Sequence, residues 1–164
     1  VIGGGDWTHD QLVPDVVRAF GRSEPVRLRN PHATRPWQFV LEPLKGYLML
    51  AERLYLDGPR YAGAYNFGPA DADAKPVRWM VATLARLWGP GATWTQDSGT
   101  HPHEAGYLKL DSSKAHAELN WEPRLRVEGA LAWLVEWYKH LAQGGDVRAK
   151  TLEQIQAYDR LWEP

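Results

Sequence analysis

The chain has 164 residues, enough for one domain with its own hydrophobic core. Its 19 basic and 20 acidic side chains give a formal net charge of −1, which argues against a general nucleic-acid or membrane-surface partner. The absence of cysteine excludes a disulfide framework and a thiolate zinc site. No apolar run is long enough to span a bilayer, and no signal-peptide pattern opens the chain, so a cytoplasmic protein is the default expectation.

The first residues, Val1 and Ile2, run directly into Gly3-Gly4-Gly5. A short apolar piece followed by glycines is typical of a strand end entering a loop. The glycines do not indicate a phosphate-binding loop, because no Gly-Lys-Ser/Thr follows them and the chain contains no G-x-G-x-x-G spacing. We expect a loop whose backbone needs positive φ.

Apolar residues at intervals of three and four predict helices over residues 10–21, 40–56, 76–88, 113–119, 127–141 and 152–162. Asp10 is the expected N-cap of the first helix, and Thr151 that of the last. The apolar stripe of the helix at 40–56 is expected to face the core. Short strands are predicted at 25–29, 64–67, 92–96 and 107–110, and the turn residues of 97–106 predict a loop.

The segment between Pro25 and Pro43 is rich in groups that suit a nucleotide: Arg27, Arg29, Asn30, Arg35 and Trp37. Four prolines restrict the backbone there, so these side chains are expected on a rigid, irregular loop. The planar fork of arginine grips phosphate well, and an aromatic ring with an amide can face a base. On the residues alone, a nucleotide or nucleotide-sugar site and a solvated basic loop are about equally favoured.

Several stretches carry a family resemblance: VIGGGDW with QLVPDVV, NPHATRPWQFVLEP, and PHEAGYLKLD with NWEP. They resemble CDP-glucose 4,6-dehydratases, which belong to the extended short-chain dehydrogenase/reductase group, over nearly the whole chain. The resemblance implies an α/β fold, mostly helices with short strands. It corresponds to the C-terminal substrate-binding part of such an enzyme, without the N-terminal Rossmann core. Residues 1–164 would form one nucleotide-sugar-binding domain, with 61–70 belonging to the Rossmann sheet of the intact protein.

The same resemblance assigns candidate substrate-binding residues. The backbone around Leu12 and Val13 would approach the phosphates, which is physically reasonable because the N–H groups at a helix start are free. Arg35 would bind the diphosphate, and Arg29 and Asn30 would lie near the base or ribose, with Asn30 reading the cytosine edge. His103 and Glu104 would close over the nucleotide. A metal site built on His101, His103 and Glu104 is disfavoured, because no further ligands follow at conventional spacing and HExxH is absent.

The chemistry of a reductase is absent from this sequence. Enzymes of this class need a tyrosine four residues before a lysine, and none of the seven tyrosines here has a lysine at that spacing. There is no dinucleotide fingerprint and no G-x-S-x-G elbow. We therefore expect the chain itself to bind substrate without turning it over, with the catalytic residues upstream of Val1.

For the intact protein, the resemblance implies a lyase with tightly held NAD, bound mainly by the N-terminal Rossmann half. The sugar's C4 hydroxyl would be oxidised, water would leave across C5 and C6, and the hydride would return to C6, giving CDP-4-keto-6-deoxyglucose for deoxysugar and polysaccharide biosynthesis. A homo-oligomer is a possible further partner. Two alternatives stay open: a related enzyme that acts on a UDP- or dTDP-sugar, and a non-catalytic nucleotide-binding module.

Overall fold

The computed structural model describes residues 1–99 and 105–163. Its helices are α1 (Leu12–Gly21), α2 (Leu41–Tyr61), α3 (Val77–Trp88), α4 (Ser113–Leu119), α5 (Val127–Ala142) and α6 (Val147–Arg160). Its strands are β1 (Val26–Leu28), β2 (Thr34–Pro36), β3 (Ala74–Pro76) and β4 (Trp94–Gln96), and a short 3₁₀ helix, η1, covers Asp71–Asp73. The fold is thus a mostly helical α/β arrangement, as the resemblance implied.

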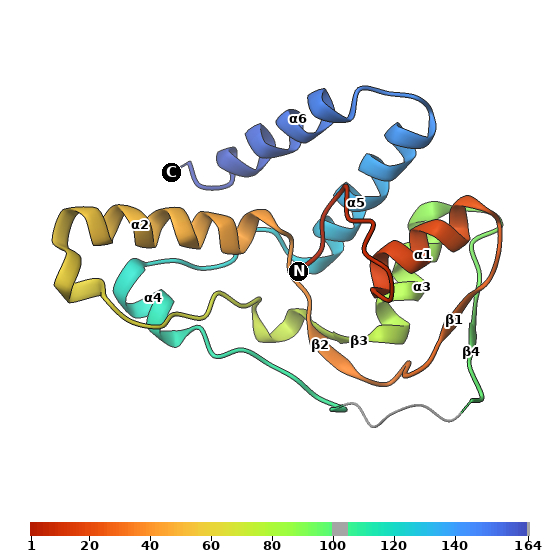
Figure 1. Ribbon diagram of the computed structural model, residues 1–164, viewed down its shortest axis with the longest axis horizontal. Coiled ribbons are helices and arrows are strands. Elements are labelled where there is room, and N and C mark those ends of the chain that lie inside the picture. The colour runs from red at the N-terminus through yellow and green to blue at the C-terminus, as the bar shows by residue number, and fades with distance from the viewer. Residues whose placement is uncertain (100–104, 164) are drawn as a thin grey trace.

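The larger hydrophobic core lies among α1, α3 and α5, which Figure 1 shows packed beside the β1–β4 pair. Each helix buries the stripe that its sequence predicts, as Val16 in α1, Met80 in α3 and Leu134 in α5 are fully buried. Strand β1 runs parallel to β4 with Val26 opposite Trp94, and its burial pattern places Val26 and Leu28 in the core. The intervening Arg27 is therefore directed away from the core.

The second pair of strands, β2 and β3, was not predicted. Here Arg35 lies opposite Lys75 in an antiparallel register, and Tyr107 adds an isolated bridge to Thr34. Each strand has three residues and ends in a proline, which cannot donate to the ladder. Such a short pair leaves no alternating pattern in the sequence, but it fixes the position of Arg35.

A smaller core joins α2 to α4 at the other end of the molecule (Figure 1). Trp121 is fully buried there, and its ring meets Phe67 edge to face at 5.1 Å. In Figure 1 the helix α6 lies above α2, and it is fixed to α5 because Gln154 Nε2 donates to the carbonyl of Trp133 at 2.8 Å.

Three helix boundaries differ from the sequence prediction. The first helix begins at Leu12 with Gln11 as N-cap, because Asp10 has a left-handed backbone (φ 60°) and its carboxylate turns to Arg29 instead. The last helix begins at Val147, since Asp146 accepts from the N–H groups of Arg148 and Ala149 and caps it. Helix α2 continues beyond the predicted end at residue 56 to Tyr61, with a kink at Asp57.

Two predicted strands are not formed. Residues 64–67 have no strand partner, and of 107–110 only Tyr107 makes a bridge. An isolated strand is unstable without a neighbour, and within the described residues neither segment has one along its length. Asn66 links the two segments, since its Nδ2 donates to the carbonyl of Asp111 at 3.2 Å.

The apolar stripe of α2 is the largest departure from the expected core. Much of it is exposed rather than buried: Leu44, Tyr47, Leu48, Leu54, Tyr55 and Leu56. Helical spacing predicts an apolar face but not what covers it, and the part of the chain that the structure describes leaves this face open. No described helix is long and apolar enough to cross a bilayer.

Candidate functional site: a guanidinium-lined cleft

A cleft of about 310 Å³ lies where the start of α1 meets the end of β1 and the strand β2. It is lined by Asp10, Gln11, Leu12, Asp15, Arg27, Leu28, Arg29, Asn30, Arg35, Trp37 and Val77. Four of the predicted site residues are among them: Leu12, Arg29, Asn30 and Arg35. Residues from three separate elements therefore converge on one cleft.

Arg35 is held in the cleft wall by its backbone and its side chain. The β2–β3 pairing fixes the backbone, and Nη1 donates to the carbonyls of Ala105 at 2.7 Å and Thr34 at 3.0 Å. Two acceptors on one nitrogen orient the planar guanidinium. An oriented fork suits the two-point binding of phosphate oxygens better than a mobile point charge does.

Arg29 is a second charged group of the cleft lining. Its Nη2 contacts the Oδ1 of Asp10 at 3.1 Å, and both side chains are largely exposed. The alternation of β1 directs Arg27 and Arg29 away from the core that Val26 and Leu28 enter, as the sequence predicts. The cleft thus carries three guanidinium groups, and that of Arg29 is paired with the carboxylate of Asp10.

The indole of Trp37 forms part of the same lining. Its Nε1 donates to the carbonyl of Lys75 at 2.8 Å, which ties the ring to β3. The ring is half-buried and packs against the larger core. A fixed aromatic ring beside arginines and an amide offers an apolar surface to a planar base.

The predicted site residues do not all contribute in the same way. The Val13 side chain is buried in the larger core and does not line the cleft, so only its backbone can face a ligand. Leu12 and Val13 lie in the first turn of α1, where N–H groups have no intrahelical acceptor. His103 and Glu104 lie outside the described residues, so their closing role stays a prediction.

Sequence reasoning missed the two acidic side chains of the cleft, Asp10 and Asp15. Asp10 was predicted to cap the first helix, and no site role was predicted for Asp15. Only the packing of α1 against β1 brings them beside the arginines, and spacing along the chain gives no signal of this. Asp15 has a partner within its helix, since Arg18 contacts its Oδ1 at 2.5 Å.

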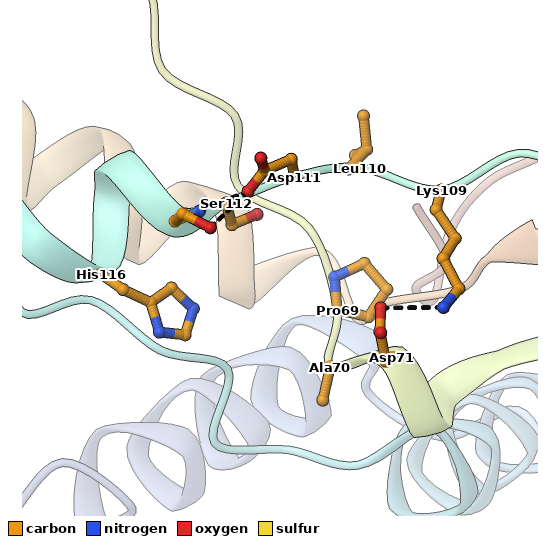
Figure 2. A pocket seen from close by; sticks show the side chains of 9 residues that line it. Pro69, Ala70, Asp71, Lys109, Leu110, Asp111, Ser112 and His116 are labelled. Carbon is orange, nitrogen blue, oxygen red and sulfur yellow. Dashed lines mark hydrogen bonds and ion pairs between the residues drawn. The ribbon is translucent and has the colours of Figure 1, made fainter.

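A larger cavity of about 680 Å³ lies between η1 and the start of α4, and Figure 2 shows its lining side chains. It contains none of the predicted site residues. Its polar groups join neighbouring loops: Lys109 pairs with Asp71 at 3.1 Å, and Asp111 accepts from the hydroxyl of Ser113 at 2.6 Å (Figure 2). The hydrogen bonds from Ser113 hold the pKa of Asp111 below its usual value. We therefore assign this cavity a structural role.

The described residues contain no metal cluster, and the glycines at the start of the chain pack against other side chains. No group of three or more His, Cys, Asp or Glu is arranged to hold a metal among residues 1–99 and 105–163. The glycines at the start serve packing: a Cβ on Gly4 would lie 2.4 Å from the Trp137 ring, and one on Gly3 2.8 Å from Val40. Gly5 has the expected positive φ, at 82°. A loop pressed against an indole does not fit the pyrophosphate of NAD.

The chain is clearly similar in sequence to a known enzyme. No protein-family model matches the chain. It is 47% identical over 158 residues to the CDP-glucose 4,6-dehydratase of Salmonella typhimurium (strain LT2), covering 96% of this chain and 44% of that enzyme. The chain therefore spans less than half the length of this relative.

Solved structures share the fold of this chain at low sequence identity. UDP-glucuronic acid 4-epimerase from Bacillus cereus, in two complexes with NAD and a UDP-sugar, superposes with TM-scores of 0.68 and 0.66 at 17% identity, covering 80% of this chain and 40% of the epimerase. RMD from Pseudomonas aeruginosa complexed with NADPH superposes with a TM-score of 0.66 at 17% identity, covering 84% and 45% of the two chains.

These matches confirm the resemblance seen in the sequence. The chain is therefore similar in sequence to the C-terminal part of a CDP-glucose 4,6-dehydratase, and its fold is that of the C-terminal part of epimerases and dehydratases of the extended short-chain dehydrogenase/reductase type.

Proposed function

We propose that the cleft between α1, β1 and β2 binds the nucleoside diphosphate of a CDP-sugar. The observation that supports this proposal is the convergence of Arg29, Asn30 and Arg35 with the first turn of α1 around one cleft. Arg35 would bind the diphosphate together with the N–H groups of Leu12 and Val13. Arg29 and Asn30 would face the ribose or base, and Trp37 would offer its ring to the base.

For the intact protein, we propose the dehydration of CDP-glucose to CDP-4-keto-6-deoxyglucose, with NAD as bound oxidant. The 47% identity to a CDP-glucose 4,6-dehydratase supports this reaction. An N-terminal Rossmann half would bind NAD and supply the catalytic tyrosine and lysine, because this sequence contains neither a dinucleotide fingerprint nor a tyrosine four residues before a lysine. In this proposal the chain positions the substrate and is inactive alone.

The exposed apolar face of α2 is where we expect that Rossmann half to pack. Leu44, Tyr47, Leu48 and Tyr55 are between 44% and 90% exposed, more apolar surface on one helix than a free chain usually leaves open. Residues 61–70 continue from α2, and they would form the predicted strand once a sheet edge is available. His103 and Glu104 would then close over the nucleotide.

A second candidate is an enzyme that acts on a UDP-sugar. The superposed epimerase structures contain UDP-sugars, but at 17% identity they support the fold and not the ligand. The match at 47% favours CDP. A non-catalytic nucleotide-binding module would use the same cleft without a catalytic half.

The proposal is tested by titrating CDP, UDP and dTDP into the chain and following tryptophan fluorescence. Trp37 lines the cleft, so bound nucleotide is expected to change its emission, and the Trp37→Phe variant identifies that signal among the nine tryptophans. We expect CDP to bind most tightly. Tighter binding of UDP or dTDP would favour the second candidate, and no binding of any of the three would contradict the proposal.

A further inference from the structure

A carboxylate in a cleft for pyrophosphate needs a physical reason. Asp10 and Asp15 both line the cleft, and both would repel a bound diphosphate. Asp15 has a structural role, because it pairs with Arg18 in the first two turns of α1. Arg18 in turn donates to the carbonyl of Trp7 at 3.1 Å, which ties α1 to the segment before it. Asp10 has no such anchoring role.

The contacts of Asp10 do little for the fold. Its side chain is 80% exposed, and its ion pair with Arg29 joins two exposed groups, an arrangement that contributes little to stability. Its backbone takes a left-handed conformation (φ 60°), which aspartate tolerates better than most residues other than glycine. Asp10 thus presents an exposed carboxylate to the cleft while contributing little to the fold, and this leaves it available to contact a ligand.

The position of Asp10 associates it with the base. It is bonded to Arg29, whose neighbour in the chain is Asn30, and all three line the cleft. Asn30 by itself does not distinguish cytosine from uracil. Its amide has both a donor and an acceptor, and it can rotate to match either base. A carboxylate can only accept, and therefore discriminates between the two.

We propose that Asp10 selects for cytosine by accepting a hydrogen bond from its exocyclic 4-amino group. This inference rests on the proposed binding of a nucleoside diphosphate and deepens it. Uracil and thymine present a carbonyl oxygen at that position, which the carboxylate would repel. Arg29 Nη2 donates to Oδ1 of Asp10, and Oδ2 would accept from the base. Specificity then combines an attractive contact with the right base and a repulsive one with the wrong base.

The test compares the ratio of CDP to UDP affinity in the unaltered chain and in the Asp10→Asn variant. The substitution keeps the size of the side chain, and asparagine tolerates the left-handed backbone. Removing a negative charge strengthens diphosphate binding equally for both nucleotides, so this effect cancels in the ratio. We expect the unaltered chain to prefer CDP by about ten- to a hundredfold, as one base-edge contact allows, and Asp10→Asn to bring the ratio close to one.

Asp15→Asn is the matched control, since it removes the other carboxylate of the same cleft. We expect it to leave the ratio unchanged. If CDP and UDP bind but Asp10→Asn preserves the preference, or weakens both nucleotides equally, Asp10 does not select the base while the proposed function stands. If the unaltered chain binds neither nucleotide, both proposals are wrong.

Discussion

The hydroxyl of Tyr158 donates a hydrogen bond to Oε2 of Glu42 at 2.9 Å, across 116 positions of the chain. Both residues are buried. The other oxygen of the same carboxylate accepts from the N–H groups of Arg124 at 3.0 Å and Leu125 at 2.6 Å. One buried carboxylate therefore fixes α6 and the connection between α4 and α5 to the first turn of α2.

We expect Tyr158→Phe to lower the free energy of unfolding by about 1–3 kcal/mol, the cost of leaving a buried acceptor without its donor. Urea unfolding at neutral pH measures the change. Tyr55→Phe is the control, because Tyr55 is 90% exposed and its loss should change stability by less than about 0.5 kcal/mol. Equal effects of the two substitutions would show that the Tyr158–Glu42 bond does not stabilise the fold.

The stability contributed by Glu42 should depend on pH. Burial raises its pKa above the ordinary value of 4.5, and the hydrogen bonds from Leu125, Tyr158 and Arg124 oppose that rise. The folded chain therefore binds more protons than the unfolded chain just above pH 4.5. The protonation of Glu42 therefore contributes its full share to the free energy of unfolding below pH 4.5. That contribution is lost as the pH rises through the pKa that Glu42 has in the folded chain.

Glu42→Gln isolates this pH dependence. The stability of the unaltered chain minus that of the variant should be larger near pH 5 than near pH 7, because glutamine does not titrate. Unfolding curves of both proteins at the two pH values provide the measurement. A difference that grows toward pH 7 would mean that the hydrogen bonds outweigh burial and lower the pKa of Glu42.

The helices around the larger core were predictable because each buries its stripe within the chain. The periodic residues of α1, α3 and α5 meet one another, so the local pattern contains the information needed. The same reasoning was wrong for the α2 stripe, where a correctly recognised apolar face has no cover in the described chain. The spacing of apolar residues predicts which face of a helix is apolar. Whether that face is buried depends on the rest of the fold.

The cleft was predictable only in part, for a similar reason. Arg29, Asn30 and Arg35 lie close together in one proline-stiffened segment, so their convergence follows from local sequence. Asp10 comes from the start of α1, and its position beside Arg29 depends on tertiary packing. The β2–β3 pair that positions Arg35 is likewise a contact between distant segments. Neither three-residue strand is long enough to show an alternating sequence pattern that would predict it.

Gly46 marks a close approach inside α2. A Cβ at this position would lie 2.3 Å from the Phe67 ring, so Gly46→Ala must displace a ring that packs on Trp121. We expect a loss of about 1–3 kcal/mol in the free energy of unfolding. Gly58→Ala, later in the same helical segment, is the control: a Cβ there meets nothing within 4 Å, and alanine should be neutral or slightly stabilising. Thermal or urea unfolding that shows the same effect for both would contradict this account of Gly46.

Arg35→Ala should weaken CDP binding by about 2–4 kcal/mol, as expected when one partner of a charge-assisted contact is truncated. This is about a 30- to 1000-fold change in dissociation constant, measured by the same fluorescence titration. Arg53→Ala removes an exposed arginine of α2 outside the cleft and should leave the affinity unchanged.

Arg35 also holds the carbonyls of Thr34 and Ala105, so the unfolding midpoint of each variant has to be compared with its affinity. Arg35→Lys separates charge from geometry. It keeps the positive charge but loses the planar fork, and we expect it to recover only part of the lost affinity. If Arg35→Ala binds CDP as tightly as the unaltered chain, the guanidinium does not contact the diphosphate. Full recovery by lysine would mean that charge alone matters, and the fixed orientation of the fork in the cleft wall would then contribute nothing to binding.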